Sequence, residues 1–382
     1  MYDFLDLQEV TLQTARRWED PGATNIYDIE CAKEILETKS TIANPTHDDT
    51  EGWVLRTLYL RCNSTPHAAW VASCTTMHII EAVGLHQESP GVSLVYSDTA
   101  TTSPNTARRR RLFWIAKLLN TWISFEYGRS AVVLRGESCQ YPTRVAGMDA
   151  TADLLSIFQI SEDLDPDQAL ETKDLEALLQ RLASYNFDCD AVVLSQTVLA
   201  FTIYRRLRLS SPSLTPATID QVIALGRRGL EACSKCIAEN CPWWHVTYVP
   251  FQFTCVLLAM DTREALTHVR DSLGTLKKAA GFFGTAKPCR AFETAELLVR
   301  LSQRQKEQDA ALLSQTVEFR GEDQDADASS LWHQHQSDSS GSDGFLWPDN
   351  ALPGQLAPSG CDWNAFIRDP LDFSSTFLRL EG

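Results

Sequence analysis

Residues 107–130 read ARRRRLFWIAKLLNTWISFEYGRS, and this stretch decides the class of fold. Ser103 can cap a helix here, Pro104 suits its first position, and neither Gly nor Pro interrupts the chain before Gly128. The apolar side chains recur at helical spacing, at Leu112, Ile115, Leu119 and Trp122. The stretch therefore predicts an amphipathic helix of about 20 residues, about 30 Å long, with one face in a core.

The rest of the chain shows the same helical signals. Thr65 and Thr215 are N-cap residues, each followed by a proline, and Gly84 stands where a helix-ending glycine belongs. Residues 242–261 hold one or two helices divided at Pro250. The other predicted helices cover residues 66–83, 167–183, 190–209, 216–238, 262–280 and 288–315. No stretch shows sustained alternation between hairpin turns, so we predict an all-α, multi-helix protein.

The composition excludes several classes of protein. The chain has 382 residues, a net charge of −16 and a pI near 4.9, which argues against a nucleic-acid-binding surface over the whole molecule. Its eleven cysteines follow no regular framework, and the N-terminus has no pattern of a secretory signal. The longest apolar stretch, residues 249–260, is too short to span a bilayer. These features predict a soluble intracellular protein with reduced thiols and no membrane partner.

The composition changes near residue 320. Residues 321–382 contain eleven Asp or Glu and two Arg, a charge of −9, and they include the low-complexity run HQHQSDSSGSDG. Such a segment is predicted to be disordered. We therefore expect an N-terminal segment (residues 1–24), a helical body (25–318) and an acidic tail (319–382). His333 and His335 could bind a metal weakly, but the pattern favours a solvated polar segment.

A cysteine cluster raises the question of a zinc site. Cys233, Cys236, Cys241 and His245 form a C-x2-C-x4-C-x3-H pattern, and three thiolates with an imidazole can hold zinc tetrahedrally. The first two cysteines, however, lie inside a predicted helix, and the spacing matches no familiar zinc module. Buried free cysteines behave as small hydrophobic residues. Helix packing is therefore the favoured interpretation, and no metal is assigned.

An acidic motif, HDDTEGW at residues 47–53, is similar to the metal-binding motif of all-helical terpene synthases, in which carboxylates hold Mg²⁺. Such enzymes need a second motif, and the nearest stretch has Asn120 and Ser124 but Gly128 where the acid belongs. Acids also favour the first turn of a helix. Helix capping is therefore the favoured role of Asp48, Asp49 and Glu51. No catalytic residue is predicted, and an all-helical Mg²⁺-dependent cyclase is a minor alternative.

The four consecutive arginines, Arg108, Arg109, Arg110 and Arg111, have two interpretations. They point around the full helix, about 100° apart, so they cannot form one flat patch. In an acidic body we expect some of them to pair with carboxylates of neighbouring helices, their alkyl stems covering apolar surface. The alternative is a nuclear-import signal, because basic runs are a generic form of such signals.

Three stretches together carry a resemblance to a known family. RRRRLFWIAKLLNTWISFEYGRS followed by VVLRGESCQYP resembles the signature of the fungal-specific transcription factor domain, the middle homology region of zinc-cluster regulators. TPHAAWVASCTTMHIIEAVGLHQES, at residues 65–89, resembles the preceding helix of that family. CPWWHVTYVPFQFTCVLLAMDT, at residues 241–262, resembles its Trp-Trp and aliphatic helix. The match runs over about residues 25–300.

The resemblance implies a transcriptional regulator in a fungal nucleus, acting on specialised-metabolite or nutrient-utilisation genes and not as an enzyme. The six-cysteine DNA-binding module of the family has no counterpart in the sequence, so direct DNA contact is not expected from this chain. Zinc would belong to that module, and no cofactor is expected here. The partners to expect are a second copy of this chain, as a homodimer, or a partner protein that binds DNA. The helical body would receive a signal from a small-molecule effector or a protein.

The acidic tail points to regulation independently of the resemblance. Aromatic and aliphatic residues held among acids are typical of acidic activation segments. Such a segment would contact a coactivator or the transcription machinery by folding into a groove. The candidate contacts are Trp363, Phe366, Ile367, Phe373 and Phe377. Two alternatives stay open, namely a tail that docks on the body as a C-terminal helix and a helical scaffold protein with no transcriptional role.

Overall fold

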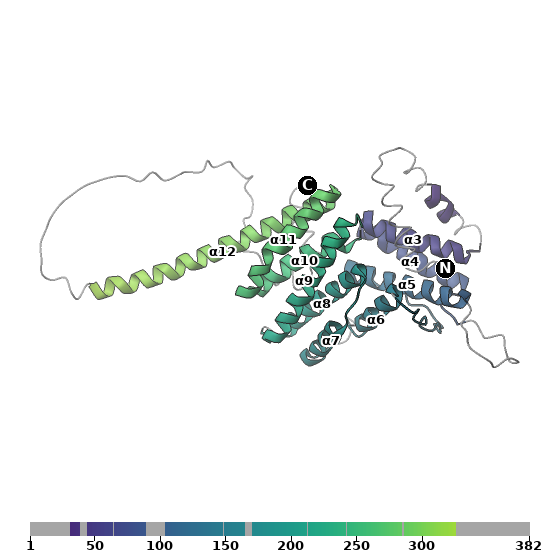
Figure 1. Ribbon diagram of the computed structural model, residues 1–382, viewed down its shortest axis with the longest axis horizontal. Coiled ribbons are helices and arrows are strands. Elements are labelled where there is room, and N and C mark those ends of the chain that lie inside the picture. Colours follow the sequence, from purple (N-terminus) through teal and green to yellow (C-terminus); the bar gives the residue numbers. More distant parts are fainter. Residues whose placement is uncertain are drawn as a thin grey trace, which may run out of the picture.

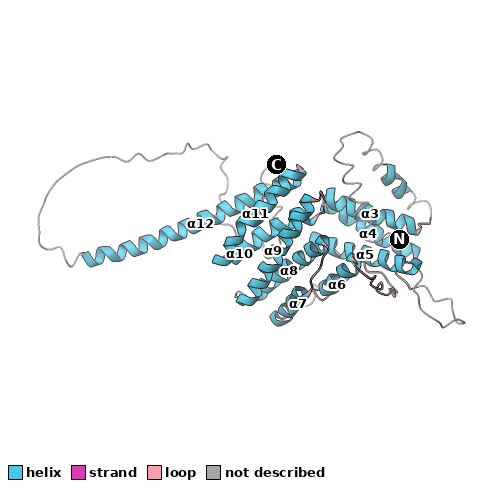
Figure 2. Cartoon of the chain, in the orientation of Figure 1, coloured by secondary structure: helices cyan, strands magenta, loops and turns pink. Residues whose placement is uncertain are grey.

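The computed structural model describes residues 31–325 apart from 39–43, 64, 89–103, 148, 165–169, 212, 242 and 285. Every regular element in these residues is helical, which confirms the all-α prediction (Figure 2). A short helical stretch covers residues 31–38. The longer helices are α3 (His47–Asn63), α4 (Pro66–Val83), α5 (Pro104–Tyr127), α6 (Ala150–Glu162), α7 (Thr172–Ser184), α8 (Asp190–Ser210), α9 (Pro216–Ala238), α10 (His245–Met260), α11 (Arg263–Phe283) and α12 (Ala286–Asp325).

The helices pack largely in chain order. Helices α3, α4 and α5 form a first group, and α6 connects α5 to α8. Helices α7 to α12 continue the succession, each packed on its neighbours, and α12 projects beyond the others (Figure 1). One hydrophobic core runs through both groups, so the two groups form one continuous body.

Helix ends follow the sequence signals closely. The Thr65 side chain accepts a hydrogen bond from the Ala68 N–H at the start of α4, and Gly84 ends that helix with a φ of 75°. The Thr215 side chain caps α9 in the same way, accepting from the Thr218 N–H. The left-handed conformation at Gly84 favours glycine, because other residues would strain there. These caps confirm the predicted bounds of α4 and α9.

Several elements differ from the expectation, among them α7, which starts at Thr172 and not at residue 167. Helix α6 was not predicted, and Asp149 caps it by accepting from the Ala152 N–H. Pro250 lies inside α10 without dividing it, and its carbonyl accepts hydrogen bonds from two side-chain hydroxyls, of Thr254 and Ser272. Helix α12 runs to residue 325, past the expected end near 315 and into the predicted tail, because no proline or capping glycine stops it before Gly321.

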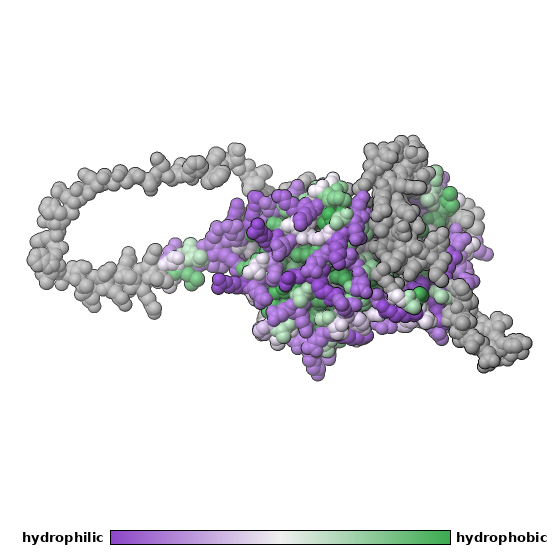
Figure 3. Space-filling model, viewed as in Figure 1, coloured by the Kyte–Doolittle hydropathy of each residue, from purple (hydrophilic) through white to green (hydrophobic). Residues whose placement is uncertain are grey.

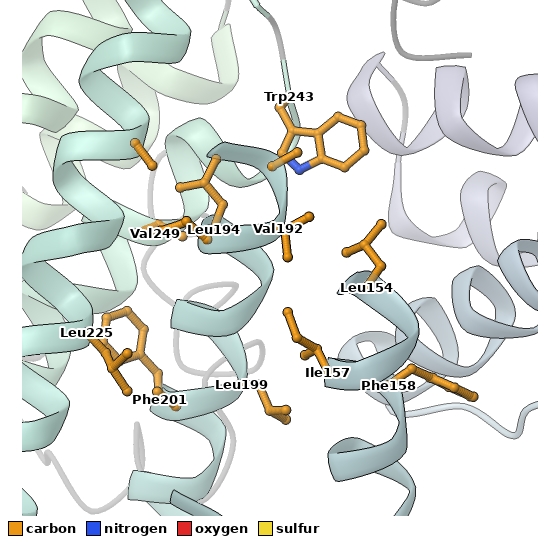
Figure 4. Close-up of a cluster of buried hydrophobic side chains, with 14 of the residues drawn as sticks. Leu154, Ile157, Phe158, Val192, Leu194, Leu199, Phe201, Leu225, Trp243 and Val249 are labelled. Carbon is orange, nitrogen blue, oxygen red and sulfur yellow. The ribbon is translucent and has the colours of Figure 1, made fainter. Parts of the chain in front are cut away.

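Buried apolar side chains of α6, α8, α9 and α10 lie together in one part of the core (Figure 4). Phe201 of α8 stacks on Phe253 of α10, with ring centroids 5.5 Å apart. Gly226 of α9 allows this approach, because a Cβ atom there would lie 2.3 Å from a ring carbon of Phe253. Gly229 plays the same role against Thr197. Among the described helices none is both long and apolar enough to cross a membrane.

Candidate functional site

The first two arginines of the run contact α3 and the end of α4. The Arg108 Nη2 atom lies 2.6 Å from the Glu51 carboxylate, on α3. The Arg109 guanidinium lies 2.9 Å from His47 Nε2 and donates to the Gly84 carbonyl at 3.4 Å. Burial and the Arg109 charge lower the pKa of His47, so its ring is neutral near pH 7 and can accept the hydrogen bond.

The next two arginines contact the segment after α4 and the start of α6. Arg110 donates from Nε and Nη2 to the Glu88 carboxylate, with a shortest distance of 2.7 Å. These hydrogen bonds lower the pKa of Glu88. Arg111 forms a fork with the Asp149 carboxylate, at 2.8 and 2.6 Å. Such bidentate pairs are the strong form of an ion pair.

Asp149 is the most constrained carboxylate of this cluster, because none of its side chain is exposed. It also accepts from the backbone N–H groups of Val145 and Ala152. Burial raises its pKa, but the Arg111 guanidinium and the two N–H groups outweigh burial and lower the pKa to about 2. Asp149 therefore stays ionised and fixes the start of α6 against α5.

Arg108 to Arg111 thus radiate from α5 toward different parts of the body, and each contacts an acidic or hydrogen-bonding group there. The run lies on a folded helix and presents no flat basic face, as its helical spacing predicts. This arrangement favours a structural role, because a receptor-read basic signal needs its charges available. Nuclear import through this run stays a prediction.

The cysteine cluster lies in the core. Cys233, Cys236 and Cys241 are buried, and His245 is 1% exposed. A hydrogen bond with the Cys241 thiol, together with burial, raises the pKa of Cys236, and burial raises that of Cys233. These thiols stay protonated, whereas a metal ligand is a thiolate. In the part of the chain that the structure describes, no three His, Cys, Asp or Glu side chains are placed to hold a metal ion.

The acidic motif contributes to helix capping and ion pairing. Thr46 caps α3 by accepting from the Asp49 N–H, and the Asp49 carboxylate accepts in return from the N–H and hydroxyl of Thr46. Glu51 pairs with Arg108, as described above. Asn120, from the proposed second motif, is buried and bridges Ser73 of α4 to the Val132 N–H. These contacts give Asp49, Glu51 and Asn120 structural roles.

A second polar cluster lies where the first group of helices meets the later ones. We name it the polar junction and define it as Arg61, Glu126, Arg205, Trp244, His245, Tyr248 and Gln252. Arg61 of α3 donates to both carboxylate oxygens of Glu126, on α5, at 2.7 and 2.8 Å. Its guanidinium also lies 4.4 Å from the centre of a Trp244 ring, in a cation–π contact. Three helices or their ends therefore meet at Arg61.

The other half of the polar junction joins α8 to α10. Arg205 is 9% exposed and donates to the Gln252 side-chain carbonyl at 3.1 Å and to the Thr202 hydroxyl at 3.0 Å. Burial raises the pKa of Tyr248 to about 12, and burial also raises the pKa of Glu126 against the opposing effect of Arg61. The junction thus holds several polar groups that are not fully removed from solvent, because the Glu126 side chain stays 29% exposed.

Several of these polar groups lack a partner. Both ring nitrogens of His245, the amide nitrogen of Gln252 and the Nη1 atom of Arg61 are buried and have no hydrogen-bond partner in the structure. Burial, with a smaller effect of Arg61, lowers the pKa of His245 well below its ordinary value, so the ring is neutral. Buried polar atoms are paired in the great majority of cases. An unpartnered set therefore marks a place where a water, a ligand or a different packing would satisfy them.

A small cavity lies beside the junction. It has a volume of about 10 Å³, and Trp244 lines it together with apolar side chains of α5 and α6. That volume holds about one water molecule, so the cavity is not a preformed pocket for a larger ligand. Trp244 and His245 lie in motifs that the sequence marks, whereas Arg61, Glu126 and Gln252 lie in no predicted site. A signal for Gln252 is its place inside an apolar run.

The other predicted site residues lie outside the described part of the chain. These are the histidines of the low-complexity run and the candidate coactivator contacts, namely His333, His335, Trp363, Phe366, Ile367, Phe373 and Phe377. Their roles remain predictions from the sequence.

Comparison with known proteins gives named relatives. No family model matches this chain, and no solved structure matches it. Transcription factor kojR of Aspergillus flavus is 42% identical over 402 aligned positions, which cover 98% of this chain and 70% of kojR. The kojR protein of Aspergillus oryzae gives the same values. Protein RDR1 of Gibberella zeae is 37% identical over 341 positions, covering 83% of this chain and 62% of RDR1.

Proposed function

This chain belongs to the family of the fungal transcription factor kojR, and we propose that it regulates a set of specialised-metabolite or nutrient-utilisation genes in the nucleus. Its membership makes it a regulator of transcription. The choice of genes rests on the resemblance of residues 65–89, 107–142 and 241–262 to fungal regulators.

The helical body and the acidic tail have separate roles in this regulation. The helical body receives a signal from a small-molecule effector or a protein partner, and the acidic tail recruits a coactivator or the transcription machinery. A second copy of this chain or a DNA-binding partner protein is the proposed partner of the body. The observation that carries the body's role is the polar junction, where His245, Gln252 and Arg61 keep buried polar atoms without partners between two groups of helices.

A transcript profile of a deletion strain against the wild type tests the regulatory proposal. We expect a coordinated change in a small set of genes, and the identity of those genes names the pathway. Unchanged transcripts with an altered metabolite would support the enzyme alternative instead. No change in either would support the scaffold alternative and contradict the proposal.

A reporter assay tests the role of the tail separately. Residues 321–382 are fused to an unrelated DNA-binding domain, and we expect the fusion to activate the reporter. The matched control replaces Trp363, Phe366, Ile367, Phe373 and Phe377 with serine, which keeps the acidic charge and removes the apolar contacts. A silent wild-type fusion, or equal activity of both fusions, would contradict activation through these side chains.

A further inference from the structure

An apolar groove lies between α10, α11 and α12, on the part of the body nearest the acidic tail in the sequence. Its volume is about 390 Å³, and its polar residues lie along α12. The apolar lining consists of Leu258, Leu266, Val269, Val299 and Ala310. A helix with an apolar stripe is a common occupant of such a groove.

The α12 side of the groove continues beyond the bundle. Ser302, Lys306 and Ala310 line the groove at four-residue spacing, and Leu313 follows three residues later on the same helical face. Leu313 is 69% exposed, and Figure 3 shows a hydrophobic patch on the projecting part of α12. A projecting helix is marginally stable alone, since most helical stability comes from packing of an apolar face. This face of α12 therefore suits a packed partner.

We propose that residues 362–380 of this same chain occupy the groove, and this rests on the proposed role of the tail. The sequence DWNAFIRDPLDFSSTFLRL places Asp369 as an N-cap and Pro370 at the first helical position. Phe373, Phe377 and Leu380 then recur at i, i+4 and i+7. That spacing gives one apolar stripe, the pattern by which an amphipathic helix enters a groove.

The length of the chain permits this return. The distance along α12 from Lys306 to Asp325 is 19 residues of helix, about 29 Å. A flexible linker of the 37 residues from Asp325 to Asp362 has a root-mean-square span of about 30–35 Å. A linker whose span matches the distance between its ends gives the highest effective concentration, in the millimolar range. The segment is therefore held where the groove can bind it.

Docking of residues 362–380 would link the acidic tail to the helical body. Phe373 and Phe377 would contact either the groove or a coactivator, but not both at once. Occupation of the groove therefore lowers the activity of the tail, and release of the segment raises it. The polar junction lies at the other end of α10 from Leu258, so a signal received there has a direct structural route to the groove.

Amide hydrogen exchange of the full chain tests the docking. We compare the wild type with the double variant Phe373→Ser/Phe377→Ser, and with Phe345→Ser as a control that removes a tail aromatic outside the segment. We expect exchange at residues 258–269 and 299–313 to quicken about tenfold in the double variant alone. Equal exchange in all three proteins would overturn the proposal. Wild-type protection that rises with protein concentration would assign the groove to a second copy and overturn it too.

Two matched substitutions on α12 test the docking by changing the groove and not the tail segment. Ala310→Arg places a charge in the groove, whereas Ala311→Arg places it one position away, outside the lining. Both residues are exposed, so both variants should fold. In a full-chain reporter we expect Ala310→Arg alone to raise activity and to quicken exchange at residues 258–269. If the exchange changes while the isolated tail stays silent, docking stands and the proposed activation by the tail fails.

Discussion

The arginine run of α5 and the polar junction place the same chemical groups in opposite situations. Arg111 forms a fork with a fully buried carboxylate that also caps α6. Arg61 instead donates to both oxygens of Glu126 from Nη2 alone, and its Nη1 atom and the neighbouring His245 ring have no hydrogen-bond partners. The first cluster is satisfied and fixes one arrangement of helices. The second is only partly satisfied, because several of its buried polar atoms make no hydrogen bond in the structure.

Removal of Arg111 should give the largest effect on stability. Arg111→Ala leaves the Asp149 carboxylate buried with its main partner gone, and we expect a loss of about 3–5 kcal/mol in the free energy of unfolding. Urea unfolding followed by circular dichroism measures it. The double variant Arg111→Ala/Asp149→Asn should recover part of the loss, since no charge is then left buried. A loss below about 1 kcal/mol in the single variant would show that Asp149 is not held as the structure has it.

Acid should weaken the same cluster. Because the pKa of Asp149 falls from 3.8 to about 2 on folding, its contribution is present above pH 4 and is lost as the pH falls through the folded value. We expect about 2 kcal/mol of stability to disappear between pH 4 and pH 2 from this group. Unfolding of Asp149→Asn should lack that component of the pH dependence. An unchanged pH profile in the variant would disprove the assignment.

A substitution in the polar junction should raise the stability of the protein, whereas Arg111→Ala lowers it. His245→Phe replaces an unpartnered buried ring by an apolar one of similar shape, which removes a desolvation cost, and we expect unfolding to be about 1 kcal/mol harder. The response to the signal should fall at the same time, measured as reporter induction in the full chain. A destabilisation of more than about 2 kcal/mol would mean that His245 makes hydrogen bonds that the structure lacks.

The smallest effect is expected at the exposed end of the arginine run. The Arg108 side chain is 48% exposed, so its pair with Glu51 is screened by solvent. Arg108→Ala should cost less than about 1 kcal/mol in urea unfolding. Nuclear fluorescence of the tagged variant also tests the import alternative. Retention of the variant in the nucleus would argue against a receptor that reads this run, while its loss, with stability unchanged, would favour one.

Local signals explain why much of the fold could be predicted. Thr65, Gly84 and Thr215 bind neighbouring backbone atoms. A few adjacent residues of sequence are therefore enough to predict these helix ends. Helix α6 was missed although its cap is also local, because Asp149 accepts from the Ala152 N–H just before an apolar run; only the ion pair of Asp149 with Arg111 depends on a distant residue. Pro250 lies in the second turn of α10, where its missing N–H removes only the hydrogen bond to the carbonyl of residue 246, and the helix continues through it.

The candidate site was harder to predict than the fold. Charge and helical spacing predicted that arginines of the run pair with carboxylates, but they did not identify Asp149 as the partner of Arg111. The polar junction brings Arg61, Glu126 and Gln252 together from three helices, and no spacing within one helix encodes that meeting. The sequence marks each of them only as a polar residue beside apolar ones, which fits a surface position equally well.

The stacking of helices in chain order has a consequence for how the protein folds. Contacts between chain neighbours form quickly, because little chain entropy is lost in closing short loops. As the chain leaves the ribosome, each helix from α3 onward can therefore pack on the one before it. The polar junction is different, because Arg61 must wait for Trp244, which is made much later. The contact between them should be among the last to form, and its absence would mark an incompletely synthesised chain.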